Sequence, residues 1–197
     1  MYSTVKRGLD IVFSLVLLIA LLPVFLALAA WVKATSRGPA IFRQTRIGRD
    51  RRAFTIYKFR TMYQSAPHMT PAHQLERAER YLTPAGGSLR HSSLDELPQL
   101  WNVLKGEMSL VGPRPALPNQ TDLLDERDKY GANALRPGLT GWAQINGRNE
   151  IPVPLKARYD GEYARDMSFL FDLKCVIGTL LGRGNPARAH IKADSNA

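Results

Sequence analysis

The sequence IVFSLVLLIALLPVFLALAAWV, residues 11–32, is an apolar run without a charged side chain, and Ser14 is its only polar residue. A straight helix of this length would cross a hydrocarbon core of about 30 Å. Pro23 lies in the middle of the run and cannot donate a backbone hydrogen bond to Ile19, so it predicts a kink. The run therefore predicts a membrane-embedded segment that bends at mid-depth.

Basic residues lie on both sides of this run. Lys6 and Arg7 precede it, and a basic group opposed only by Asp50 follows it: Lys33, Arg37, Arg43, Arg46, Arg49, Arg51 and Arg52. Because positive charge marks the cytoplasmic side of a membrane, we interpret residues 1–35 as a re-entrant anchor that turns at Pro23. The alternatives are a spanning helix that tolerates its proline and a signal peptide with small residues at Ala27-Leu28-Ala29.

The composition of the 197-residue chain points to an anionic partner. Its 27 Lys and Arg residues outnumber its 17 Asp and Glu residues, for a net charge of +10. Nucleic acid, a lipid headgroup and a nucleotide are the candidate partners. The single cysteine, Cys175, excludes an internal disulfide framework and fits a reducing compartment. The length suits one domain with a core large enough to fold.

The stretch Ser93-Leu94-Asp95-Glu96-Leu97-Pro98-Gln99 places two adjacent carboxylates before a helix, whose apolar face is Leu97, Leu100, Trp101 and Leu104. Because proline is tolerated only in a first helical turn, Asp95 is expected at or beside the N-cap, where the helix end keeps it ionised. An acidic pair in this position commonly does no more than cap the helix. The alternative is that it handles a phosphate together with a metal ion.

Arg114 strengthens the second interpretation, because Pro113 and Pro115 hold it extended. The planar guanidinium of arginine suits bidentate contact with phosphate. An ordinary surface loop is the alternative. Further candidate phosphate contacts are Lys58, Arg60, Arg136 and Arg148. The first two could instead be solvated hairpin charges, and the last two belong to a turn-rich segment that could simply pack Trp142.

The remaining chain predicts an α+β fold that is mainly helical. Alternation of apolar and polar residues over Ile41–Arg46 and Ala53–Arg60 predicts a basic β-hairpin. The polar segment 64–87 is expected to be a loop with a short helical piece, Gln74–Leu82. Leu155–Leu181 is expected to be helical, as a core helix or an amphipathic helix lying flat on a membrane, and the polar tail after it to be disordered.

The chain, from about Lys6 to about Leu181, resembles the bacterial sugar transferase family, the monotopic phosphoglycosyl transferases, in its minimal form. The residues that carry the resemblance are Ser93–Gln99, Gly106–Pro115, Arg136–Arg148, Lys58–Met62 and Tyr159-Asp160 with Tyr163. One departure is Leu22 before Pro23, where relatives often carry serine.

The resemblance implies transfer of a sugar phosphate from a UDP-sugar to polyprenyl (undecaprenyl) phosphate, with release of UMP, as the first membrane step of bacterial glycan assembly. It implies that Asp95 is the nucleophile of a covalent aspartyl phosphosugar route and that Glu96 is its metal or acid–base partner. It also implies Mg²⁺, with Asp95 and Glu96 as candidate ligands.

The resemblance further implies a re-entrant anchor at residues 1–35, a catalytic domain at residues 36–182 on the cytoplasmic face of the bacterial inner membrane, a polar tail at residues 183–197, and no nucleic-acid partner. Direct transfer through a ternary complex is one alternative. A membrane-anchored basic module that binds lipid or nucleic acid without catalysis is the other. The sugar, the glycan pathway, the principal metal ligand and the oligomeric state, a homo-oligomer included, stay open.

Overall fold

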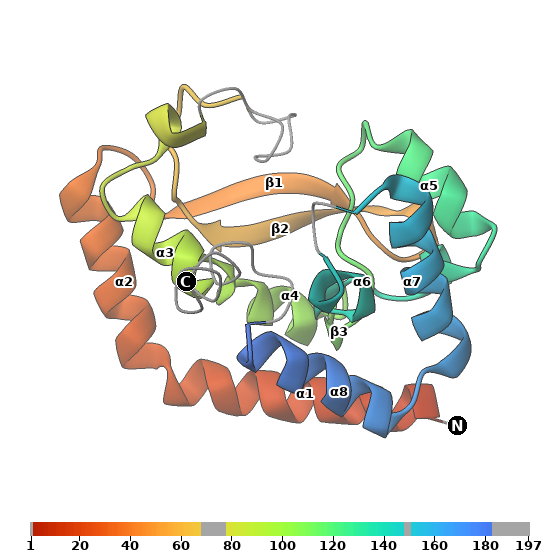
Figure 1. The fold of residues 1–197 in the computed structure, drawn as a ribbon. Helices are drawn as coiled ribbons and strands as arrows, with labels where there is room; N and C mark the ends of the chain where they lie inside the picture. The colour runs from red at the N-terminus through yellow and green to blue at the C-terminus, as the bar shows by residue number, and fades with distance from the viewer. Residues whose placement is uncertain (1, 68–77, 148–150, 183–197) are drawn as a thin grey trace, which may run out of the picture.

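The structure is a computed structural model that describes residues 2–67, 78–147 and 151–182. It is mainly helical with two small sheets, which confirms the α+β prediction at that level. Figure 1 shows α1 (Tyr2–Ala20) along the lower edge and α2 (Leu22–Thr35) rising from its end, with the β-hairpin above α1 and the short helices between them.

The break between α1 and α2 confirms the predicted kink. The two helices meet at Leu21 at an angle of 63°, and Pro23 lies in the first turn of α2, where its missing N–H is tolerated. Within the described part of the chain, no single helix has the length and apolar composition needed to cross a bilayer. The bent pair α1–α2 meets those two criteria only when it is taken together.

The inner face of α1 carries three buried polar side chains, two of which bind the rest of the fold. Lys6, Asp10 and Ser14 recur every four residues and are 8%, 3% and 0% exposed; we call them the inner polar stripe. Lys6 Nζ lies 2.6 Å from Asp172 Oδ2, and Asp10 Oδ1 accepts a 3.0 Å hydrogen bond from the Leu110 backbone N–H. The opposite face of α1 is apolar and exposed, with residues that include Val12, Phe13, Val16 and Ile19.

The predicted hairpin is confirmed. β1 (Ile41–Ile47) pairs in antiparallel register with β2 (Ala53–Phe59), and a 3₁₀ turn, η1 (Arg49–Arg51), joins them. Phe59 at the end of β2 is 2% exposed and packs against Phe25 of α2, which fixes one end of the hairpin on α2.

The segment before the carboxylate pair differs from the prediction. Of the expected helical piece Gln74–Leu82, residues 74–77 lie outside the described residues, and Ala78–Tyr81 forms a 3₁₀ turn, η3. The unpredicted helix α3 (Gly86–Ser92) follows. Its first glycine lies directly against the preceding chain, since a Cβ on Gly86 would be 1.9 Å from Thr61 O.

The expectation that Asp95 caps the following helix is wrong. Ser93 adopts a left-handed conformation (φ 58°), and Asp95 lies inside a 3₁₀ turn, η4 (Leu94–Glu96). α4 (Gln99–Lys105) begins after Pro98. Because proline lacks the N–H that an α-helix would use there, the chain enters α4 through a tighter turn.

A second sheet, which the sequence did not predict, pairs β3 (Ser109–Val111) with β4 (Gly138–Thr140) in parallel. Between these strands the chain forms α5 (Thr121–Asp128) and the 3₁₀ turn η5 (Ala132–Ala134), and α6 (Trp142–Ile145) follows β4.

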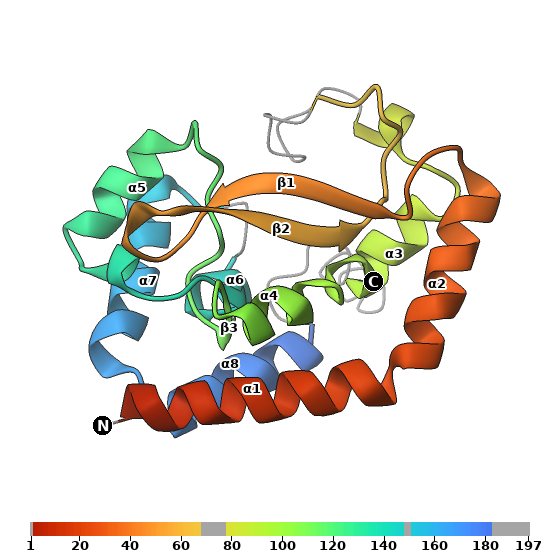
Figure 2. The same cartoon turned by 180° about the vertical axis from the view of Figure 1, so that it is seen from behind.

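The C-terminal part is helical as predicted, but as two helices. α7 (Val153–Asp166) and α8 (Phe169–Leu180) are separated by Met167 and Ser168. Ser168 is extended and caps α8 by accepting a hydrogen bond from the Phe171 N–H. Figures 1 and 2 show α8 lying beside α1. Residues 183–197, the predicted disordered tail, lie outside the described residues.

Candidate active site

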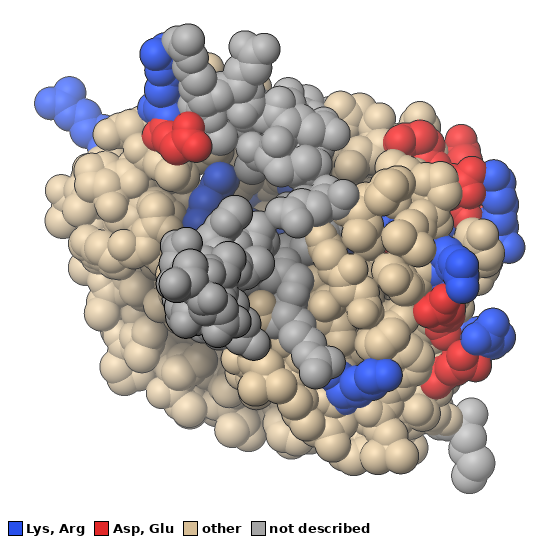
Figure 3. All heavy atoms as spheres, viewed as in Figure 1, with Lys and Arg blue, Asp and Glu red and all other residues tan. Residues whose placement is uncertain are grey.

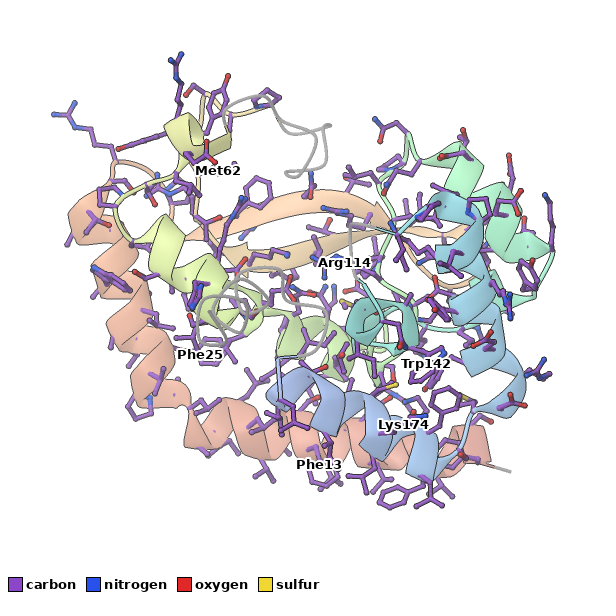
Figure 4. The ribbon with its side chains drawn as sticks, in the orientation of Figure 1. Phe13, Phe25, Met62, Arg114, Trp142 and Lys174 are labelled. Carbon is purple, nitrogen blue, oxygen red and sulfur yellow. The ribbon has the colours of Figure 1, made fainter. Side chains whose placement is uncertain are left out.

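The carboxylate pair lies in η4, between the hairpin and the loop that follows β3. Asp95 and Glu96 are each 7% exposed. Glu96 Oε1 accepts hydrogen bonds from Lys58 Nζ of β2 at 2.6 Å and from Arg114 Nη2 at 3.0 Å. The structure thus brings together four of the predicted site residues from three distant parts of the sequence, and Figure 4 shows Arg114 directed into the space between β2 and α4.

Backbone hydrogen bonds hold the Arg114 loop on both sides. Gly112 N–H donates to Thr140 O at 2.8 Å, and Gly138 N–H donates to Pro113 O at 2.8 Å. Gly112 has to be glycine at this approach, because a Cβ would lie 2.4 Å from a backbone oxygen of the facing chain. On the other side, a backbone hydrogen bond joins β1 to the loop just after Pro115. Arg114 is therefore held by more than its flanking prolines.

Burial and neighbouring charges shift the pKa values of these groups. Glu96 raises the pKa of Arg114, which keeps the guanidinium charged. Burial lowers the pKa of Lys58, although Glu96 opposes this effect. Burial also raises the pKa of Asp95, and Lys58 is the strongest of the cations that oppose the rise. The net shift disfavours the ionised form of Asp95, which the surrounding positive charge stabilises only in part.

Two arginines that sequence reasoning missed also face this cluster. Arg90 of α3 donates from Nε to Thr61 Oγ1 at 2.9 Å; burial lowers its pKa, while the two carboxylates act in the opposite direction. Arg46 of β1 lies beside Arg114, and burial together with that neighbour lowers its pKa to about 10. Positive charge therefore exceeds negative charge around the pair, an arrangement that favours a multiply charged anion.

Of the other predicted phosphate contacts, Arg60 and Arg136 do not join the cluster. Arg60 is 3% exposed, and its two Nη atoms donate to the carbonyls of Ser36 and Arg37 at the end of α2. Arg136 donates from Nε to Gly106 O at 2.8 Å, at the far end of α4. Arg148 lies outside the described residues. Arg60 and Arg136 thus contact backbone carbonyls at helix ends in this structure.

The carboxylate pair fits a Mg²⁺ ion that is held together with a substrate. In the described ranges, no group of three or more His, Cys, Asp or Glu side chains could hold a metal ion. Mg²⁺ is usually bound by one or two carboxylates and completed by substrate phosphates. Asp95 accepts no side-chain or backbone hydrogen bond from the described residues, so its oxygens are open to such an ion.

The comparisons with known proteins agree with this chemistry. The profile of the family described as bacterial sugar transferase matches residues 1–183. The chain is 42% identical over 185 residues to an undecaprenyl-phosphate glucose phosphotransferase of Komagataeibacter xylinus, covering 89% of this chain and 35% of the relative. It is 40% identical to the UDP-glucose:undecaprenyl-phosphate glucose-1-phosphate transferase of Xanthomonas campestris pv. campestris, covering 90% of this chain and 38% of the relative.

A third relative is similar in length. The exopolysaccharide production protein ExoY of Sinorhizobium fredii is 36% identical over 198 residues, covering 91% of this chain and 87% of that protein. The chain therefore spans somewhat more than a third of the two named transferases, at 35% and 38% of their length, and most of ExoY.

Proposed function

The chain belongs to the bacterial sugar transferase family, and from this membership we propose that it is a phosphoglycosyl transferase. It moves a sugar 1-phosphate from a UDP-sugar to undecaprenyl phosphate and releases UMP. The observation that carries the proposal is the carboxylate pair, in which Glu96 is bound by Lys58 and Arg114 while Asp95 accepts no hydrogen bond from the described residues. Relatives named for glucose and for N-acetylgalactosamine transfer support a UDP-sugar as donor.

The proposed reaction has two steps. An Asp95 carboxylate oxygen attacks the phosphorus that carries the sugar, and the bond to the bridging oxygen breaks, so that UMP leaves with that oxygen. A phosphate oxygen of the lipid acceptor then attacks the same phosphorus and restores the free carboxylate. Lys58 and Arg114 bind the phosphate oxygens as negative charge shifts toward UMP. Asp95 and Glu96 would hold Mg²⁺, which would supply further neutralisation of the diphosphate.

UMP release tests this function. The protein in detergent or lipid nanodiscs is supplied with single UDP-sugars, Mg²⁺ and undecaprenyl phosphate, and UMP is measured. A UDP-sugar that gives UMP in proportion to acceptor supports the proposal and identifies the sugar. Absence of UMP with every UDP-sugar, together with tight binding of anionic vesicles or nucleic acid, would favour the non-catalytic module.

We propose further that residues 1–35 form a re-entrant anchor and that residues 36–182 lie on the cytoplasmic face of the inner membrane. The 63° bend between α1 and α2 supports this topology. So does the inner polar stripe, because a spanning α1 would draw its partners Asp172 and Leu110 into the bilayer.

The surface around α1 supports the same placement. The lower margin of the space-filling view, where Figure 1 places α1, shows no charged spheres (Figure 3). The outward face of α8 adds a neighbouring apolar surface, formed by Phe169, Leu170, Leu173, Ile177 and Leu180. Such a face suits a helix lying in the membrane interface.

Cysteine labelling tests the topology. In a Cys175→Ser background, Ser3→Cys and Ala34→Cys should both react with a membrane-impermeant maleimide from the cytoplasmic side only, because both ends of the anchor lie there. Leu22→Cys, at the bend, should be protected from both sides. Right-side-out vesicles report labelling from the periplasmic side, and inside-out vesicles report labelling from the cytoplasmic side. Labelling of Ser3→Cys from the periplasmic side alone would identify a spanning helix.

Replacing Arg114 with lysine should lower the turnover rate by at least about tenfold, or roughly 1.4 kcal/mol in the barrier. Lysine keeps the positive charge but loses the planar pair of donors. Steady-state kinetics with the best UDP-sugar give the change in kcat and KM. The matched control is Arg158→Lys, whose guanidinium makes an exposed pair with Glu162. Equal activity of the two variants would show that Arg114 does not bind the phosphate and is an ordinary loop residue.

A further inference from the structure

Gln99, the first residue of α4, carries a buried amide that the described structure leaves unused. The residue is 2% exposed, and its Nε2 has no hydrogen-bond partner among the described residues. Unpaired buried amides are costly to a folded protein and rare in native structures. Such a group is expected where a functional state supplies the missing partner.

Among the described residues, the Asp95 carboxylate is an unpaired acceptor, and it precedes this unpaired donor by four residues. Asp95 is 7% exposed and accepts no hydrogen bond from the described residues. Gln99 follows it by four residues, and the intervening Leu97 (φ −53°) and Pro98 (φ −61°) have right-handed helical dihedrals. Residues three and four apart on a helix are neighbours on its surface. The Gln99 amide therefore lies about one turn further along the chain than the Asp95 carboxylate, an interval of about 5 to 6 Å that a glutamine side chain can span.

We propose that, with the donor substrate bound, Gln99 Nε2–H donates a hydrogen bond to the Asp95 carboxylate and directs its free oxygen at the phosphorus. This inference rests on the proposed function and names Gln99 as a positioning residue for the nucleophile. Gln99 acts through Asp95 and does not itself touch the reacting phosphoryl group.

Substrate binding explains why this bond is used only during the reaction. Before the substrate binds, Lys58 and Arg114 hold Glu96 and attract Asp95 through space. Once a diphosphate is present, these cations contact its oxygens, and their hold on Asp95 weakens. A neutral amide then orients the carboxylate without withdrawing as much negative charge as a bonded cation would. The nucleophile stays both aligned and reactive.

The experiment is Gln99→Met, a change that keeps the volume and removes the donor. Because it also removes an unpaired buried amide, the Tm in detergent should equal or exceed that of the wild type. The rate of the UMP burst in the absence of lipid acceptor should fall at least about tenfold, with the donor KM changed less than about threefold. Gln99→Glu, which adds a second negative charge beside Asp95, should lower the burst rate further.

The control is Gln144→Met, the same change at another buried glutamine, in α6, whose Oε1 has no partner among the described residues and whose Nε2 donates to Leu139 O at 3.4 Å. Its burst rate should equal that of the wild type. A lower Tm for Gln99→Met, an unchanged burst rate, or a rise in donor KM alone would each overturn the assignment. A wild-type protein that releases no UMP would instead overturn the proposed function, so the two failures are distinguishable.

Discussion

Asparagine at position 95 should remove both the burst of UMP and the covalent adduct. With UDP-sugar and Mg²⁺ but no lipid acceptor, the wild-type protein should release at most one equivalent of UMP and gain the mass of one sugar phosphate. The amide of Asp95→Asn has the same shape but no charge and little nucleophilicity, so turnover should fall more than about a thousandfold. Intact-protein mass spectrometry and a UMP assay measure the two quantities.

The fold should tolerate this change. Asp95 accepts no hydrogen bond from the described residues, and burial raises its pKa, so a neutral side chain is no worse placed there. Glu96→Gln is the comparison: the nucleophile stays, but Lys58 and Arg114 lose their shared partner. That variant should form the adduct slowly. If Asp95→Asn keeps substantial turnover and the wild type never forms an adduct, transfer proceeds directly through a ternary complex.

The largest expected effect on stability comes from Asp160→Asn. Asp160 of α7 and Arg127 of α5 form an ion pair of 2.7 Å whose side chains are 1% and 4% exposed. Removing one charge of a buried pair leaves the other without compensation, which costs about 3–5 kcal/mol. For a chain of this size, the Tm should fall by roughly 10 °C or more. Thermal unfolding in detergent gives the value.

Asp166→Asn is the matched control, because it changes the same residue type on the same helix at an exposed pair with Arg165. It should leave the Tm unchanged. The double variant Arg127→Met, Asp160→Leu should regain much of the loss, since replacing both charges with apolar groups removes the uncompensated charge. A Tm for Asp160→Asn equal to that of Asp166→Asn would show that the pair does not stabilise the link between α5 and α7.

Local rules predicted the elements whose causes are local. Pro23 predicts a break in a helix wherever the helix lies, and strand alternation predicts β1 and β2 without reference to the rest of the fold. The pairing of β3 with β4 was not predictable in this way. Each strand has only three residues, too few to show alternation, and their contact depends on close backbone approach at Gly112.

The same difference between local and long-range causes explains which site residues could be predicted from the sequence. The motifs identified Asp95, Glu96, Lys58 and Arg114. Arg90 was missed because α3 begins with Gly86-Gly87, a poor start for an isolated helix, and is stabilised by packing of Leu89, which is 0% exposed.

Arg60 was expected beside Lys58, two residues away on one strand face. β2, however, ends at Phe59, and the next residue turns to the carbonyl groups at the end of α2. The end of a strand depends on its contacts with other parts of the fold, and those contacts cannot be predicted from the local sequence.

The attachment of α1 bears on whether the proposed membrane anchor could be replaced by the membrane helix of another protein. The inner polar stripe is one attachment of α1, and Arg7 is another. Its Nη1 and Nη2 donate to the carbonyls of Val103 and Leu104 at 2.6 and 2.9 Å and so cap the C-terminal end of α4. The N-terminal end of the same helix follows the carboxylate pair. A chimera that carries the membrane helix of an unrelated protein could still bind the bilayer. The groups that contact α1 here, Asp172, the Leu110 N–H and the carbonyls of Val103 and Leu104, would lose their partners. We therefore expect the proposed anchor to work only with the part of the chain that it contacts here, because an exchanged helix would leave those groups without their partners.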